Sequence, residues 1–317
     1  MTMQLEPGIA IFVSRLQDAI KSLGKPITPT ERRTWLAVRG KEFPFPPFED
    51  LEITNTFIVM PGREIPVRVF RPKAAVGKAI PLIMYFHGGG FVAGDLDTHD
   101  AITALLSRHA NAAVISVHYR RAPENPYPAG IDDCDAATRW ATNNAATLCI
   151  DPAKLVLAGD SAGGAFAASL AIRCRDRGFP NVLRQLLLYP VLDNDFDRPS
   201  YLRGADPFLL RDTMRYYISA YVQGDVDLDN PDAIPMRVKS TDGLAPAYIL
   251  VADHDPLRDE AFVYAEKLAK GGVPVRIKEW PGTIHGFIRA QELSGVSRQA
   301  LDDLAAYLEE AFSGDQA

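Results

Sequence analysis

A serine between glycines follows a strongly apolar segment near the middle of the chain. Residues 155–158 (Leu-Val-Leu-Ala) lead directly into Gly159-Asp160-Ser161-Ala162-Gly163-Gly164. A strand that turns at once into a helix presents one side chain at the apex of the turn, and only small residues fit beside it. Gly159 and Gly163 leave that room, so the pattern indicates that Ser161 is a presented nucleophile. The N–H group of Ala162 would then point to where an oxyanion forms.

A second glycine-rich segment ends an earlier apolar run, and its sequence is His87-Gly88-Gly89-Gly90-Phe91. Three consecutive glycines cost backbone entropy and offer no side chain for packing, so they are typical of a loop whose N–H groups approach a ligand closely. Such a loop can donate hydrogen bonds to a developing oxyanion. We interpret His87 as a side chain that braces this loop rather than as a base that transfers protons.

A serine nucleophile needs a base and an acid that orients the base. In a fold with a strand–serine–helix turn they follow in the order Ser, then Asp or Glu, then His. Of the six histidines, only His254 and His285 follow Ser161. We predict that His285 is the base, because it lies in a glycine-flanked loop after the last strand-like run, whereas His254 directly neighbours the candidate acids. The acid is expected just after the apolar run 247–252, where the candidates are Asp253 and Asp255.

A parallel sheet is predicted to position these groups. Short, nearly continuous apolar runs alternate with helix-length segments, which is typical of an α/β fold whose sheet is covered on both faces. The runs are 81–86, 112–117, 154–158, 186–189 and 247–252, with a last strand-like run at 273–280. Helices are expected at 100–110, 130–143, 162–175, 258–270 and 297–311. The reactive segments all follow strands, at the edge where such sheets hold their sites.

The N-terminal part of the chain is predicted to be more irregular. Apolar residues from Phe12 to Leu23 recur at helical spacing, and Gly24 and Pro26 end this amphipathic helix. Residues 32–48 include a Pro-rich stretch and are expected to form an extended connector to the main body. Residues 52–59 and 65–70 then alternate in a way that favours two antiparallel strands joined by a turn at Pro61-Gly62.

Composition excludes several classes of protein. The chain has 317 residues, of which 47% are hydrophobic and 23% charged, as expected for a globular protein with a sizeable core. Its net charge of −6 argues against a nucleic-acid partner. No run of apolar residues is long enough to span a membrane, and no signal peptide is recognised at the N-terminus. Three cysteines without ligand-like spacing favour free thiols in a reducing compartment, so a cytoplasmic protein is expected.

Five motifs in this order resemble the hormone-sensitive-lipase-like branch of the α/β-hydrolase esterases. They are His87-Gly88-Gly89-Gly90, Tyr119-Arg120-Arg121-Ala122-Pro123-Glu124, Gly159-Asp160-Ser161-Ala162-Gly163-Gly164, Asp255-Pro256-Leu257-Arg258-Asp259 and His285-Gly286-Phe287. The resemblance covers the chain from about residue 57 onward. It implies the α/β-hydrolase fold, with a mostly parallel sheet flanked by helices.

The resemblance also implies a role for each matched residue. It makes Ser161 the nucleophile, His285 the base and Asp255 the acid, because the family places its acid directly before Pro-Leu. The oxyanion hole is assigned to the segment Gly88, Gly89 and Gly90 together with Ala162, with Gly88 shaping the loop and the other three donating N–H groups. Arg121 departs from the leucine that the family commonly has, which puts a surface contact or the pocket wall in question.

A helical cap over the site is a further implication of the resemblance. Residues 1–47 are expected to form an N-terminal cap segment, and an insertion at about 200–230 adds to it within a catalytic domain of residues 48–317. The expected substrate pocket is formed by Phe91, Asp160, Tyr189, Phe208, Leu209, Met214 and Phe287. Caps of this kind shape the acyl pocket, although an aromatic stripe can equally be the cap's own core.

These features predict a serine carboxylesterase that hydrolyses short- to medium-chain acyl esters through an acyl-enzyme intermediate. Metals and cofactors are not required by this chemistry. The expected partner is a small-molecule ester, and the resemblance also suggests a homodimer formed through an exposed terminal strand. Two alternatives remain open at this stage, namely an amidase or peptidase with the same triad and a non-catalytic homologue that binds a small molecule.

Overall fold

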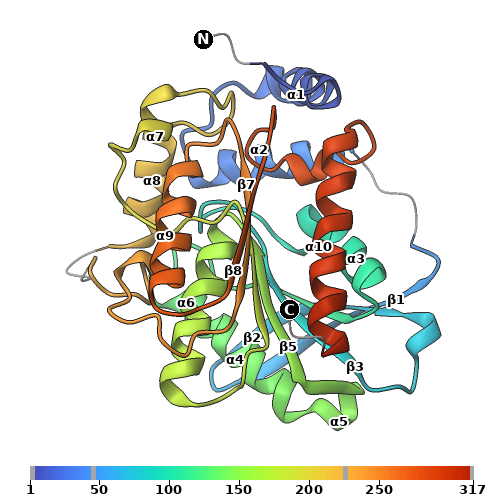
Figure 1. Ribbon diagram of the computed structural model, residues 1–317. Helices are drawn as coiled ribbons and strands as arrows, with labels where there is room; N and C mark the ends of the chain where they lie inside the picture. Colours follow the sequence, from blue (N-terminus) through green and yellow to red (C-terminus); the bar gives the residue numbers. More distant parts are fainter. Residues whose placement is uncertain (1–3, 44–47, 224–227, 315–317) are drawn as a thin grey trace.

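An eight-stranded sheet forms the centre of the molecule in the computed structural model, which describes residues 4–43, 48–223 and 228–314 (Figure 1). The strand order is β1-β2-β4-β3-β5-β6-β7-β8. The strands are β1 (Leu51–Met60), β2 (Arg63–Pro72), β3 (Ile80–Phe86), β4 (Ala113–Val117), β5 (Ile150–Asp160), β6 (Arg184–Leu188), β7 (Ala247–Ala252) and β8 (Val275–Trp280). The only antiparallel pairs among these strands are β1–β2 and β2–β4, so β2 alone runs against the others and the expected mostly parallel sheet is confirmed.

Helices cover both faces of the sheet. Their apolar sides form two cores, one between the sheet and α4, α6 and α9, the other between the sheet and α1, α3 and α10. The helices are α1 (Pro7–Ile20), α2 (Pro29–Lys41), α3 (Leu96–Ala110), α4 (Ala129–Asn143), α5 (Ala145–Leu148), α6 (Ala162–Arg177), α7 (Pro199–Arg203), α8 (Arg211–Tyr221), α9 (Arg258–Lys270) and α10 (Gly295–Ser313). The five helices expected from the apolar pattern correspond to α3, α4, α6, α9 and α10. In the described part of the chain, the structure holds no helix that is both long and apolar enough to cross a membrane.

The helix α2 corrects the expectation of an irregular connector. The segment 29–41 is helical because Thr28 caps its N-terminus, Glu31 reaches back to the Thr28 amide, and Pro29 occupies the first turn, where its missing N–H costs nothing. Sequence reasoning missed this helix because it is polar on most sides and lacks a clear apolar stripe. The Pro-rich stretch of the expected connector lies largely at 44–47, outside the described residues.

The helix α2 and the segment containing α7 and α8 lie at the same end of the sheet, beyond the carboxyl ends of the parallel strands (Figure 1). They touch one another through aromatic contacts. The ring of Trp35 on α2 lies edge-on to Phe208, with ring centroids 6.0 Å apart. The guanidinium of Arg32 stacks over Tyr216 of α8 at 4.0 Å. The two segments therefore enclose the space above the strand ends.

Candidate active site

Ser161 occupies the apex of a sharp turn between β5 and α6. Its φ and ψ angles are 56° and −119°, a strained backbone conformation for a residue with a side chain. The turn is held by backbone hydrogen bonds, since the Ser161 amide donates to the Leu188 carbonyl at 2.9 Å and the Ser161 carbonyl accepts from Val191 at 3.0 Å. Strain fixed in this way indicates that the position of the hydroxyl is functionally important.

The glycine at 163 is required by close packing against β3. A Cβ atom at this position would lie 1.9 Å from the carbonyl oxygen of Phe86 and 2.8 Å from that of His87. Both atoms belong to the backbone that leads into the glycine-rich loop, so neither can move without displacing that loop. The sequence expectation that small residues must surround Ser161 thus has a specific cause here.

We expect Gly163→Ala to destabilise the fold by about 1–3 kcal/mol, because the added methyl group forces α6 and β3 apart. The measurement is the free energy of unfolding in urea, together with the rate of hydrolysis of a para-nitrophenyl ester. Gly295→Ala is the matched control, since a Cβ at residue 295 in the first turn of α10 meets nothing closer than 3.9 Å. Equal stability of the two variants would contradict this account of Gly163.

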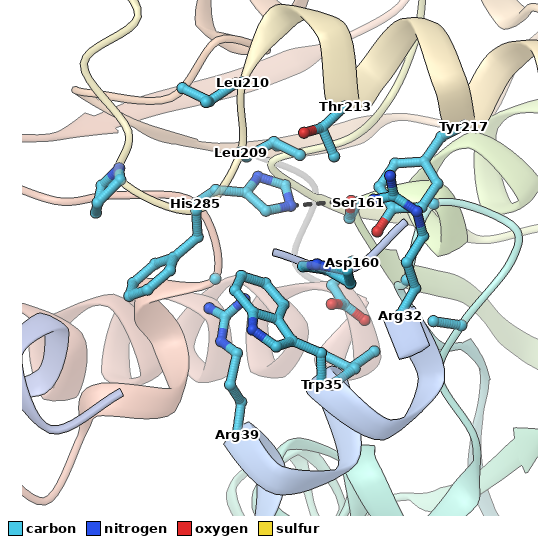
Figure 2. A pocket seen from close by; sticks show the side chains of 18 of the residues that line it. Arg32, Trp35, Arg39, Asp160, Ser161, Leu209, Leu210, Thr213, Tyr217 and His285 are labelled. Carbon is cyan, nitrogen blue, oxygen red and sulfur yellow. Dashed lines mark hydrogen bonds between the residues drawn. The ribbon is translucent and has the colours of Figure 1, made fainter. Parts of the chain in front are cut away.

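Three side chains from distant parts of the sequence meet at the turn. The Nε2 atom of His285 lies 2.9 Å from the Ser161 hydroxyl oxygen, and its Nδ1 atom lies 2.6 Å from a carboxylate oxygen of Asp255 (Figure 2 shows the contact between His285 and Ser161). Asp255 follows β7, and His285 lies in the loop after β8. Asp253, the other candidate acid, instead accepts a hydrogen bond from the Gly282 amide. His254 makes no contact with Ser161 and lies toward Gln4.

The electrostatic surroundings of His285 favour its protonated form. Burial alone would lower its pKa, but attraction by the Asp255 carboxylate and the hydrogen bond between them raise it above the ordinary value of 6.5. The imidazole is therefore a stronger base than a free histidine. Hydrogen bonds on both ring nitrogens suit it to take a proton from the Ser161 hydroxyl and hold it.

Asp206 is a buried carboxylate that sequence reasoning did not identify. It accepts the backbone N–H of His285 at 2.8 Å and the N–H groups of Phe208 and Leu209 at 2.7 and 2.9 Å. Burial, followed by repulsion from Asp255, raises its pKa. The residue thus ties the segment before α8 to the loop that carries His285. An aspartate directly before Pro207 was the only sequence signal of such a turn.

The glycine-rich loop after β3 faces the same hydroxyl. Gly88 donates its N–H to Asp160 at 2.8 Å, so this amide is already occupied and its part is to hold the loop. Gly89 and Gly90 adopt φ angles of 124° and 62°, which suit glycine, and they line the cavity beside Ser161. Among the described residues, the amides of Gly89 and Gly90 make no backbone hydrogen bond. They are available to an oxygen bound in the cavity.

A buried polar network supports the loop from below. The Asp160 carboxylate accepts from the Tyr85 hydroxyl at 2.6 Å and lies 3.3 Å from His99 Nε2. Burial would raise the pKa of Asp160, but attraction by His99 and its hydrogen bonds lower it below the usual value. His87 is fully buried and stacks on Tyr119. Burial is the main reason that the pKa of His87 lies well below its usual value, so the ring is neutral. Its position fits the interpretation as a brace.

A cavity of about 330 Å³ lies above Ser161 (Figure 2). Of the seven pocket residues expected from sequence, Asp160, Phe208 and Leu209 line it. The structure corrects the other four expectations. These side chains are buried behind the cavity wall and do not line it, namely Phe91, Tyr189, Met214 and Phe287. Phe91 illustrates the reason, since its ring stacks on Tyr221 at 4.0 Å and belongs to the core between the sheet and α8.

The opposite wall of the cavity comes from α2, which lies within the expected N-terminal cap segment, although none of its residues was among the expected pocket residues. Arg32, Trp35, Leu36 and Arg39 line it from this helix, and Thr213 and Tyr217 line it from α8. Residues 32, 35, 36 and 39 are spaced so that they lie on one face of a helix. This spacing is visible in the sequence once the helix is known. Arg121, the residue that departs from the family pattern, does not line the cavity. Its guanidinium donates to the Gly94 carbonyl at 2.5 Å.

Comparison with known proteins gives concordant matches. A family model with the description alpha/beta hydrolase fold matches residues 83–289. The chain is 44% identical over 230 residues to the carboxylesterase NlhH of Mycobacterium tuberculosis, covering 71% of this chain and 72% of that protein. It is 34% identical over 305 residues to the ethyl acetate hydrolase of Pseudomonas putida, covering 90% and 93%. The crystal structure of a thermostable esterase from Pseudomonas putida superimposes with a TM-score of 0.90 at 31% identity, covering 98% of this chain and 99% of that chain.

Proposed function

This chain belongs to the hormone-sensitive-lipase-like branch of the α/β-hydrolase family, and we propose on that premise that Ser161, His285 and Asp255 are its catalytic triad. The protein is a serine carboxylesterase. The observation that carries the residue assignment is the pair of hydrogen bonds of 2.6 and 2.9 Å that joins Asp255, His285 and Ser161 into one chain of contacts.

The geometry supports a two-step acyl transfer. His285 takes the proton of the Ser161 hydroxyl as this oxygen attacks the ester carbonyl, and the carbonyl oxygen becomes an oxyanion. The amides of Gly89, Gly90 and Ala162 donate to that oxyanion, since Ala162 opens α6, where the first N–H groups have no partner within the helix. The protonated imidazole then delivers its proton to the leaving alcohol. A water molecule repeats the sequence on the acyl-enzyme and releases the acid.

Residues 1–47 and about 200–230 act as a cap on a catalytic domain of residues 48–317 in this proposal. Support comes from the described parts of both segments, which close the cavity above Ser161 and contact each other through Trp35 and Phe208. A cavity of about 330 Å³ fits short to medium acyl chains better than the three chains of a triacylglycerol.

A chain-length series of para-nitrophenyl esters tests this function. We expect kcat/KM to be highest for acyl groups from acetate to octanoate and to fall steeply for palmitate, because a long chain exceeds the volume of the cavity. Release of nitrophenolate is the readout, and para-nitroanilide analogues form the amide arm. Hydrolysis of the anilides with a kcat/KM equal to that of the esters would favour an amidase, and absence of turnover with every ester would remove the carboxylesterase assignment.

We further propose a cytoplasmic location and a homodimer. The three cysteines, Cys134, Cys149 and Cys174, are free thiols, and burial raises the pKa of Cys134 and Cys174, which suits a reducing compartment. The strand β8 ends the sheet and is paired on one side with β7 alone, so its other edge can pair with a second copy. Light scattering of the purified protein gives its molar mass, which tests whether it is a dimer.

A further inference from the structure

The cavity above Ser161 is rich in cations although the chain as a whole is acidic. Lys25, Arg32, Arg39 and Arg289 line it, whereas Asp160 is the one carboxylate among the lining residues that the structure describes. Asp160 is already engaged by the Tyr85 hydroxyl and the Gly88 amide. The net charge of the whole chain is −6, so the positive charge of this cavity is opposite in sign to the balance of the chain.

Arg39 lacks a charged partner in the described structure. Within the described residues its guanidinium forms no ion pair, and its Nε atom is buried without a hydrogen-bond partner. Arg32 likewise forms no ion pair in the described part of the chain and has a buried Nε atom without a partner, whereas Arg33 on the same helix pairs with Glu124 at 2.6 Å. Figure 2 shows Arg39 reaching from α2 toward the cavity, beside Trp35. An Nε–H group that is buried without an acceptor is costly, which calls for an explanation.

Aromatic packing accounts for only part of the Arg39 environment. Its guanidinium lies 4.3 Å from the ring centroid of Phe208 and 4.9 Å from that of Trp35. These contacts use the faces of the guanidinium and stabilise its charge. They provide no acceptor for the N–H groups, which point outward in the guanidinium plane. The edge of the Arg39 guanidinium therefore presents N–H donors that have no acceptor in the described structure, at the wall of the cavity.

The charge on Arg39 persists at neutral pH. Burial, followed by repulsion from Arg289, lowers its pKa to about 10, and attraction by Asp206 opposes this shift only in part. Arg289 lies four residues after His285 and donates to His99 Nε2 at 2.6 Å, so its position is fixed by the network below the glycine-rich loop. Two guanidinium groups that line the same cavity and repel one another are both stabilised by an anion bound beside them.

We propose that the cavity binds esters that carry a carboxylate group away from the scissile bond, and that Arg39 binds this carboxylate. The proposal rests on the proposed esterase function and adds a substrate class to it. A guanidinium edge matches a carboxylate with two parallel N–H···O hydrogen bonds, which a neutral acyl chain cannot offer. Because Arg32 and Arg289 line the same cavity, the field at Arg39 favours an anion over an isosteric neutral group.

Two pairs of substrates test the proposal. The first pair is monoethyl adipate and the corresponding ethyl ester of adipic monoamide, which differ in charge on the acyl half. The second pair is acetoxybutanoate and acetoxybutanamide, which differ in charge on the alcohol half. Product release is followed by chromatography. For one of the pairs, we expect wild-type kcat/KM to be about tenfold or more higher for the anion, as a charge-assisted hydrogen bond allows.

Variants of Arg39 separate binding of the anion from general effects on folding. In Arg39→Met the ratio of kcat/KM for the anion to that for the amide is expected to fall to about one or below, whereas Arg39→Lys keeps part of the preference because it keeps the charge. The ratio compares two substrates on the same protein, so a lower fraction of folded enzyme cancels. Lys41→Gln is the matched control, since Lys41 is an exposed cation on the same helix outside the cavity lining, and its ratio should equal that of the wild type.

The possible outcomes separate this proposal from the esterase function. A wild-type ratio near one for both pairs, or the same preference in Arg39→Met as in wild type, overturns the carboxylate-binding role while leaving the esterase intact. Failure to hydrolyse any of the four esters and para-nitrophenyl butyrate as well is instead a failure of the function on which the proposal rests. A preference in one pair only identifies the half of the ester that carries the carboxylate.

Discussion

Ser161→Ala is expected to lower kcat for para-nitrophenyl butyrate by about 10⁵- to 10⁶-fold, the size of loss found when a serine hydrolase is deprived of its nucleophile. The reason is that no other hydroxyl lies within hydrogen-bond distance of His285 Nε2 in the described structure, so no substitute nucleophile is available. The small residual rate would come from the oxyanion donors and from binding. Burst and steady-state release of nitrophenolate measure both the acyl-enzyme and its turnover.

The matched control for this variant is Ser169→Ala. Ser169 lies two turns further along α6, is buried, and donates to the Pro231 carbonyl at 2.9 Å. The same chemical change there removes one hydrogen bond, which costs about 1 kcal/mol of stability and leaves kcat within a few-fold of wild type. A Ser161→Ala protein that keeps more than a hundredth of the wild-type kcat would rule out the nucleophile assigned here.

Asp255→Asn is expected to lower kcat by about 10⁴-fold, because a carboxamide can donate an N–H to Nδ1, which holds the imidazole in the wrong tautomer, and it lacks the charge that stabilises the imidazolium. The variant should also move the acid limb of the kcat–pH profile. In the wild type, activity falls as the pH drops through the raised pKa of His285, since the protonated ring cannot act as a base. Removing the Asp255 charge lowers that pKa, so the residual activity should persist to lower pH.

The shift is expected to be partial, because Asp206 and Asp160 also attract the His285 imidazolium and both remain in the variant. Asp253→Asn is the control. Asp253 also follows β7, two residues before Asp255. It accepts a hydrogen bond from the Gly282 amide and does not contact the His285 ring, which pairs with Asp255. Its profile should have the wild-type acid limb and a kcat within a few-fold of wild type. A larger loss for Asp253→Asn than for Asp255→Asn would reverse the assignment of the acid.

The local geometry of the serine turn could be read from sequence because it depends on atoms that are close along the chain. Gly159 and Gly163 stand on either side of Ser161, and the structure gives each a backbone contact that leaves no room for a Cβ. The apolar runs predicted the parallel strands because helices bury both faces of these strands, so that successive residues along each run are apolar. The order of the motifs then limited the base to two histidines.

The choice between Asp253 and Asp255 needed more than spacing. Both follow β7 and both are acceptors of backbone N–H groups, but their carboxylates point in different directions at the end of the strand. The family resemblance favoured Asp255, and the structure has this residue in contact with His285. Sequence spacing alone is insensitive to such a difference, because both residues lie beyond the end of β7, where the alternation that would place residues i and i+2 on one face of a strand no longer applies.

The amino-acid sequence by itself determined the sheet, the serine turn and the glycine-rich loop, because these features are governed by local sterics and by burial along single segments. Tertiary structure alone decided what faces the cavity. A polar helix at 29–41 carries Arg39 and Trp35 over Ser161, and Phe91 and Met214 turn away into the core. Those placements depend on which distant segments pack together, and the packing free energy of a cap on a sheet is not encoded in the periodicity of either segment.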